Sequence, residues 1–447
     1  MIKIYDTMTR SLRDFVPLTE NVVNMYVCGP TVYNYIHIGN ARSTVAFDTI
    51  RRYFEYRGYT VNYISNFTDV DDKIIKAANE AGISTKELSD KFIAAFMEDT
   101  AQLGIKPATQ NPRVINYMDE IIAFVSTLVD KGFAYVSEGD VYFRVAKSKN
   151  YAKLANKTLE DLEIGASGRT DAETARKENP LDFALWKAAK EGEVSWESPW
   201  GPGRPGWHIE CSVMATEILG DTIDIHGGGA DLEFPHHTNE IAQSEAKTGK
   251  TFANYWMHNG FVNVDNEKMS KSLGNFVTVH DMLKTVDGQV LRFFLATQQY
   301  RKPINFTEKA IHDAEVNLKY LKNTHSLPLT DQVNQAELQT YLDAFQEAMD
   351  DDFNTANGVT VLFDMAKWIN SGNYDQTVKD AFEKMLQVFG IIFEEEVLDE
   401  DIEKLIEERQ AARANKDFAT ADRIRDELAA QGIKLLDTKD GVRWTRD

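Results

Sequence analysis

The chain has 447 residues and a net charge of −21, with 43% hydrophobic, 11% aromatic and 27% charged residues. This is ordinary globular composition, which excludes a disordered or fibrous chain, and the length suits about three domains. No apolar run approaches the ~18 residues of a membrane-spanning helix and none at the start resembles a secretory signal, so we expect a cytoplasmic protein without a membrane partner. The 70 acids against 49 bases argue at first against a nucleic-acid partner.

The first part of the chain is predicted to form a βαβ unit. Residues 21–28 are nearly continuously apolar, as in a strand covered on both faces. Residues 40–57 carry one apolar stripe at helical spacing, and a second strand is expected over 60–66. The unit predicts a Rossmann-like, doubly wound parallel α/β sheet whose ligands bind beyond the carboxyl ends of its strands.

The remaining elements predict that this sheet is split by an insertion and followed by helices. Helical periodicity is expected from 74 to 132, and irregular sequence with short strands from 133 to 197. The Pro- and Gly-rich residues 198–206 are predicted to be a loop that leads back to the sheet domain. Further on we expect a strand over 222–229, helices over 236–248, 279–295 and 307–393, and a helical hairpin followed by a small strand hairpin over 401–447.

Two motifs could bind a nucleotide. His37-Ile38-Gly39-Asn40 directly precedes the first helix, where a glycine lets a ligand approach the free N–H groups of the helix end. Residues 268–272, Lys-Met-Ser-Lys-Ser, place two lysines three residues apart in a polar loop, where they could clamp a polyphosphate. Taken singly, each motif is also compatible with an ordinary turn.

Together and in this order, the motifs resemble the two signatures of class I aminoacyl-tRNA synthetases. The resemblance implies that ATP is bound by His37, Gly39, Asn40, Lys268, Ser270 and Lys271. Four of these are implied to be catalytic, namely His37, Asn40, Lys268 and Lys271. Asn40 stands where the family has histidine, so it keeps the capacity for hydrogen bonds and lacks the charge.

The two cysteines, Cys28 and Cys211, are too few for a disulfide framework. With His236 and Glu240, which share a helix face four residues apart, they make a reasonable zinc set. His237 competes with His236 as a ligand. The alternative is that the cysteines are buried apolar residues and the His–Glu pair is a helix contact.

The segments 27–33 and 224–232 resemble the cysteinyl-tRNA synthetase family, and the resemblance covers essentially the whole chain. It implies one Zn²⁺ per chain, bound by Cys28, Cys211, His236 and Glu240, which selects the cysteine thiolate over serine without an editing domain. It also implies a substrate pocket formed by Gly29, Thr68, Trp207 and Asp231. Trp207 could instead be core, and Asp69, Asp71 and Asp72 could be a metal cluster or an acidic helix start.

The implied reaction is activation of L-cysteine by ATP with Mg²⁺, followed by transfer to tRNA(Cys), in a monomer. The alternative is a cysteine-activating ligase with a non-tRNA amine acceptor. The expected division is 1–120 and 206–260 for the two halves of the catalytic domain, 121–205 for the insertion, 261–310 for the lysine loop and stem-contact region, 311–400 for a helical bundle and 401–447 for an anticodon-binding domain.

The charge is unevenly distributed. Residues 343–400 hold 14 acids and 3 bases, whereas residues 401–447 hold 11 acids and 10 bases. Near the end, Arg443, Trp444 and Arg446 suit contact with unstacked RNA bases, although a solvated tail is an equal alternative. The acidic excess therefore marks 343–400 as the segment least suited to RNA.

Overall fold

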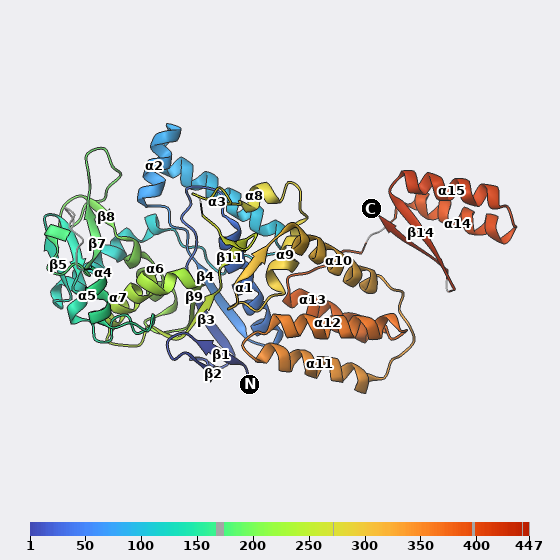
Figure 1. Ribbon diagram of the computed structural model, residues 1–447, viewed down its shortest axis with the longest axis horizontal. Helices are drawn as coiled ribbons and strands as arrows, with labels where there is room; N and C mark the ends of the chain where they lie inside the picture. Colours follow the sequence, from blue (N-terminus) through green and yellow to red (C-terminus); the bar gives the residue numbers. More distant parts are fainter. Residues whose placement is uncertain (167–173, 271, 396–397, 440, 447) are drawn as a thin grey trace. The chain divides into compact units, whose positions relative to one another are not determined.

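The computed structural model describes residues 1–166, 174–270, 272–395, 398–439 and 441–446 (Figure 1). Lys271, a predicted catalytic residue, lies outside the described residues. The chain divides into two compact units, Met1–Ile392 and Phe393–Asp447. Among the described helices, none is both long and apolar enough to cross a membrane.

The core of the first unit is a four-stranded parallel sheet in the order β10-β9-β3-β4. Its strands are β3 (Val22–Val27), β4 (Thr60–Ser65), β9 (Ile223–Gly229) and β10 (Ala253–Asn259). Helix α1 (Ile38–Tyr56) connects β3 to β4 and buries residues such as Val45, Phe47 and Phe54. The predicted βαβ unit and parallel sheet are confirmed.

Between β4 and β9 lies a long segment that includes residues 121–205, the expected insertion. It contains α2 (Asp72–Ala81), α3 (Thr85–Gln102), α4 (Met118–Asp130), α5 (Leu159–Ala166) and an antiparallel sheet of β5 (Ala134–Ser137), β6 (Asp140–Phe143), β7 (Phe183–Ala188) and β8 (Gly203–Pro205). The prediction of a loop throughout 198–206 is wrong at β8, which pairs with β7. A Cβ on Gly203 would lie 2.3 Å from the Trp186 indole nitrogen, so glycine permits this pairing.

Helix α6 (Trp207–Leu219) leads into β9, and α7 (Thr238–Thr248) joins β9 to β10. After β10 come three short strands in the order β12-β11-β13: β11 (Val262–Val264), β12 (Glu267–Lys268) and β13 (Ile304–Phe306). The single helix expected over 279–295 is instead α8 (Val279–Met282) and α9 (Gly288–Ala296), because Asp287 caps a new helix by accepting from Gln289 N and Val290 N.

A helical bundle completes the first unit: α10 (Glu308–His325), α11 (Gln335–Asp350), α12 (Thr355–Asn370) and α13 (Gln376–Val388). A hairpin of β1 (Lys3–Asp6) and β2 (Ser11–Asp14) begins the chain. The second unit consists of α14 (Glu400–Ala414), α15 (Phe418–Ala430), β14 (Ile433–Thr438) and β15 (Gly441–Arg446) around a core that includes Ile402, Ile424 and Leu428.

Candidate active site

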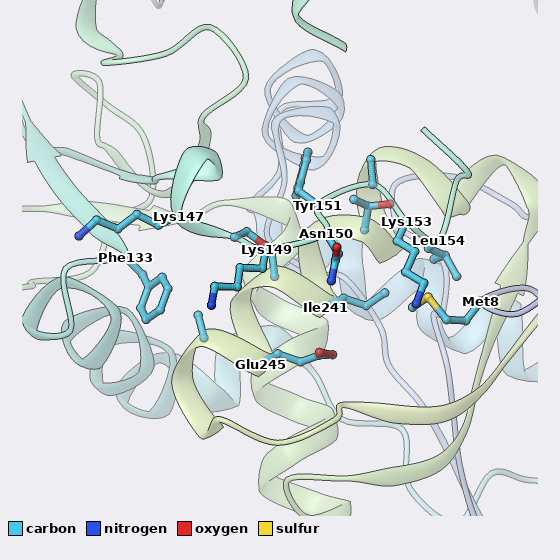
Figure 2. Close-up of a pocket in the computed structure, with 15 residues that line it drawn as sticks. Met8, Phe133, Lys147, Lys149, Asn150, Tyr151, Lys153, Leu154, Ile241 and Glu245 are labelled. Carbon is cyan, nitrogen blue, oxygen red and sulfur yellow. The ribbon is translucent and has the colours of Figure 1, made fainter. Parts of the chain in front are cut away.

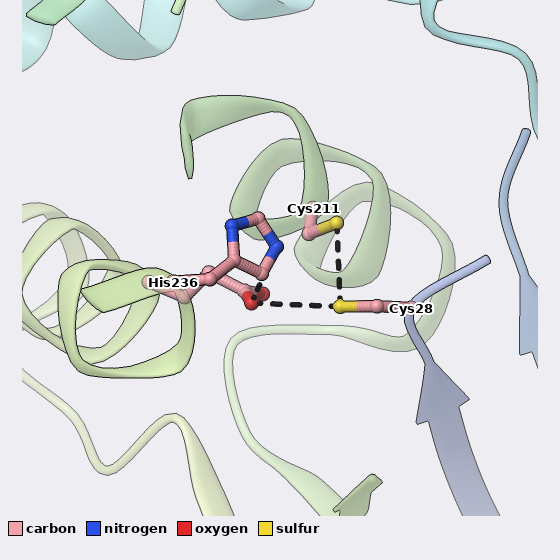
Figure 3. Close-up of side chains that lie close together, drawn as sticks. Cys28, Cys211 and His236 are labelled. Carbon is pink, nitrogen blue, oxygen red and sulfur yellow. Dashed lines mark hydrogen bonds and ion pairs between the residues drawn. The ribbon is translucent and has the colours of Figure 1, made fainter. Parts of the chain in front are cut away.

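Four predicted metal ligands meet beyond the carboxyl end of β3 (Figure 3). Cys28 directly follows β3, Cys211 lies on α6, His236 lies in the turn before α7, and Glu240 lies in the first turn of α7. Cys28 Sγ is 3.6 Å from both Cys211 Sγ and Glu240 Oε2, and His236 Nε2 is 3.3 Å from Glu240 Oε2. The ligand atoms all lie within 4.8 Å of one another.

These separations fit a tetrahedral zinc ion. With usual zinc–ligand bond lengths, two sulfurs lie about 3.8 Å apart, sulfur and oxygen about 3.6 Å, and nitrogen and oxygen about 3.4 Å. The observed 3.6, 3.6 and 3.3 Å are close to these edges. The four side chains therefore suit the zinc ion that the resemblance implies.

Burial disfavours the charged form of the acids and bases in this cluster. It raises the pKa of Cys28 and of Glu240, and it lowers the pKa of His236. The lowered pKa favours the neutral imidazole of His236, which is the form of histidine that binds metals.

A network of histidines surrounds the cluster, and the sequence reasoning missed most of it. His226 on β9 contacts Glu240 Oε1 through Nε2 at 2.8 Å, and both side chains are fully buried. His237 Nε2 lies 3.5 Å from Cys28 Sγ, while its Nδ1 lies 2.7 Å from His258 Nε2. A second set of Cys28, His226, His237 and Glu240 has similar spacing, so His237 is also near enough to compete.

At the start of α1, His37 and Asn40 cap the helix for each other. His37 Nδ1 accepts from Asn40 N at 3.1 Å, and Asn40 Oδ1 accepts from His37 N at 3.2 Å. This reciprocal pair is a capping box, and it orients the His37 ring at the helix end. The Asn40 amide, at the position where the family has histidine, thus stabilises the start of the helix.

The lysine loop lies against this helix end. Val277 O accepts from Ile38 N at 3.1 Å, and Met269 Cε would lie 3.6 Å from a Cβ placed on Gly39. Within the loop, Ser270 N donates to Asn275 Oδ1 at 2.8 Å. Lys268 ends β12, and its Nζ lies 5.6 Å from the centre of the Phe261 ring.

A cleft of about 600 Å³ brings most of the predicted residues together. Among the described predicted residues, those that do not line it are Thr68, Cys211, His236, Glu240 and Ser270. Thr68 is buried, where it accepts from Asn66 Nδ2 at 3.2 Å. Trp207 is 42% exposed and stacks on His236 with ring centres 4.2 Å apart, so it is not a core residue. The predicted residues that line the cleft are Cys28, Gly29, His37, Gly39, Asn40, Trp207, Asp231 and Lys268.

The three acids near the start of α2 do not gather around a common point. Asp69 accepts from Arg113 Nε at 2.9 Å, Asp71 caps α2 by accepting from Lys73 N at 2.7 Å, and Asp72 pairs with Arg204. These contacts support the interpretation as an acidic helix start.

A second hollow, of about 280 Å³, lies between residues 147–154 and α7 (Figure 2). Its walls include Lys149, Tyr151, Ile241 and Glu245, and none of the predicted site residues lines it. It is separate from the cleft that holds the motifs.

Family models match most of the chain. A model for the catalytic domain of class I (C) tRNA synthetases matches residues 14–316, a DALR domain matches 344–394, and a cysteinyl-tRNA ligase anticodon-binding domain matches 395–444.

The chain is 96% identical to a cysteine–tRNA ligase of Streptococcus thermophilus and 83% identical to one of Streptococcus pyogenes, each over 447 residues and 100% of both chains. Among solved structures, a Mycobacterium tuberculosis methionyl-tRNA synthetase aligns with a TM-score of 0.60 at 15% identity over 82% of this chain and 89% of that one. An Agrobacterium radiobacter leucyl enzyme aligns with a TM-score of 0.61 at 10% identity over 84% of each. These two structures show a shared fold.

Proposed function

We propose that this chain, which belongs to the cysteinyl-tRNA synthetase family, selects its amino acid through a zinc ion held by Cys28, Cys211, His236 and Glu240. The chain is a class I ligase that joins L-cysteine to tRNA(Cys) at the expense of ATP. The match to an anticodon-binding domain at 395–444 favours tRNA over a non-tRNA amine as the acceptor.

Selection of cysteine over serine is difficult because the two side chains differ only in a sulfur or an oxygen atom. Apolar contacts alone would separate such similar side chains by only ~1–3 kcal/mol. Zinc supplies a soft Lewis acid that binds a thiolate far better than a neutral hydroxyl.

Trp207, stacked on His236 at the edge of the cluster, would close the pocket over the bound side chain. Gly29 lines the cleft and packs closely on Asn66, since a Cβ there would lie 1.7 Å from Asn66 O. Asp231 would hold the substrate ammonium group, and Thr68 would support the pocket from behind.

The other end of the cleft would activate the carboxylate. The α-phosphate of ATP would lie at the N-terminus of α1, with His37, Gly39 and Asn40 around it. Attack by the cysteine carboxylate forms cysteinyl-adenylate and releases pyrophosphate, whose charge Lys268, Ser270 and Lys271 would stabilise, with Mg²⁺ accompanying the nucleotide. The ribose hydroxyl of the terminal tRNA adenosine then attacks the acyl carbon, which forms the ester bond to tRNA and breaks the bond to phosphate, so that AMP leaves. We expect one zinc per chain and a monomeric, cytoplasmic enzyme.

The observation that carries the zinc proposal is that the four ligand atoms lie within 4.8 Å of one another, with three separations close to the edges of a tetrahedral zinc site. Its test is ATP–pyrophosphate exchange with cysteine and with serine, together with metal analysis. We expect about one zinc per chain and exchange that depends on cysteine. Equal exchange with serine in the zinc-loaded protein, or full cysteine selectivity after zinc removal, would contradict the proposal.

A further inference from the structure

The turn that follows α9, residues 295–302, is fixed to helix α1 by one buried side chain. Arg42, on α1, is 1% exposed. Its Nη1 donates to Leu295 O at 2.7 Å, and its Nη2 donates to Gln299 O at 3.0 Å and to Lys302 O at 3.2 Å. A planar guanidinium that binds several carbonyl groups of one turn leaves that turn little freedom to move against the helix.

The same turn is held from the other side by the helical bundle. Asp352, between α11 and α12, is 2% exposed and accepts from Tyr300 Oη at 2.6 Å and from Arg301 Nε at 2.7 Å. It also accepts from Tyr5 N at 2.9 Å, so β1 joins the contact. Asp352 has a φ of 53°, a left-handed conformation that is uncommon for residues other than glycine. The backbone thus takes a costly conformation at the residue that makes these contacts.

This turn is connected to the lysine loop through three short strands. Just after it comes β13, which pairs in parallel with β11, and β11 pairs in turn with β12. In this register Asn263 lies opposite both Asn305 and Lys268. Asn305 Nδ2 also donates to Asn266 Oδ1 at 2.9 Å, which ties β13 to the turn that precedes β12. Three hydrogen-bonded strands therefore connect the turn to Lys268, which lines the cleft.

We propose that Arg42 and Asp352 are positioning residues for adenylate formation, which set the place of Lys268 relative to the phosphate-binding end of α1. Arg42 ties the turn to the helix that His37 caps, and Asp352 ties the same turn to the bundle. The two ATP-binding motifs are thus held at a fixed spacing by groups that touch neither ATP nor cysteine. The inference rests on the proposed role of Lys268.

The variant Asp352→Asn tests the proposal. Asparagine tolerates a left-handed backbone, so the variant keeps the turn and loses the charge that pairs with Arg301. Because a small misplacement of a catalytic group is costly, we expect the kcat of ATP–pyrophosphate exchange to fall about tenfold per active site. The KM for cysteine and the zinc content should stay within about twofold, since the metal cluster lies on other elements. Arg301→Gln, which removes the same ion pair from a 40% exposed side chain, provides a second variant if Asp352→Asn folds poorly.

Repeating the change in a Lys268→Ala background separates positioning from a general loss of stability. If Asp352 acts through Lys268, its substitution changes exchange by less than about twofold once the lysine is absent. Glu383→Gln is the matched control, because Glu383 pairs with His325 at 2.8 Å within the same bundle. It should leave exchange unchanged in both backgrounds.

Wild-type kcat in Asp352→Asn and in Arg301→Gln, or equal losses with and without Lys268, would overturn the positioning role. If Lys268→Ala itself left exchange unchanged, the proposed function of that lysine would be wrong instead. The two failures are therefore distinguishable.

Discussion

Replacing His226 by leucine tests whether the histidine network supports the metal cluster. His226 Nε2 forms a hydrogen bond with Glu240 Oε1 at 2.8 Å, and both side chains are fully buried. Leucine is of comparable size, so the main loss is this hydrogen bond, which orients a ligand carboxylate. Losing such a partner of a metal ligand lowers metal affinity about 10–100-fold, or about 1.4–2.7 kcal/mol.

The assay is competition for zinc between the purified protein and a chromophoric chelator. His325→Leu is the control, because His325 is also buried and pairs with a carboxylate, Glu383, at 2.8 Å, in the bundle and not at the cluster. We expect the His226 variant to lose zinc at a lower chelator concentration and the control to match the wild type. Unchanged zinc affinity in His226→Leu, or an equal loss in the control, would refute the reasoning.

Three further outcomes are expected. Lys268→Ala should lower cysteine-dependent pyrophosphate exchange about 10²-fold with zinc retained, since one charge-stabilising group is lost, and near wild-type exchange would contradict its role. Cys211→Ser should lose zinc and discrimination against serine together, so metal analysis showing one zinc per chain in this variant would count against the ligand set. Asp48→Asn should destabilise the first unit by about 3–5 kcal/mol, seen as a lower Tm, because Arg292 stays fully buried beside a neutral amide. Burial raises the pKa of Asp48, but Arg292 and Arg52 outweigh it and hold that pKa below its usual value. The carboxylate therefore contributes stability above about pH 4 that is lost as the pH falls further, and the variant should lack this part of the acid sensitivity, measured as Tm against pH.

Much of the architecture could be predicted because apolar patterns within short segments determine the strands and helices. The apolar strands around Val23 and Ile225 and the stripe through Phe47 indicate a parallel sheet without any long-range information. The break between α8 and α9 was missed because Asp287 interrupts an apolar pattern that continues on both sides.

The candidate site was less accessible to sequence reasoning. Cys28 and Cys211 are far apart in the chain, and only the order of strands β9 and β3 and the return of the chain through α6 bring them together. His226 lies in a segment that contributed to the family resemblance, yet a lone histidine in a strand does not reveal its partner on α7. Asp352 lies in the acidic segment 343–400, whose composition does not reveal that the fold buries this carboxylate.

The capping box at the start of α1 determines which nitrogen of His37 can donate a hydrogen bond. Nδ1 accepts the N–H of Asn40, so the neutral ring must carry its hydrogen on Nε2. The ring therefore acts as a hydrogen-bond donor through Nε2 in its neutral tautomer, without needing a charge. An aspartate at position 40 could accept the backbone N–H of His37, as Asn40 Oδ1 does, but it would place a negative charge at the proposed phosphate site. Asparagine keeps the helix start intact and adds no negative charge at the proposed triphosphate site.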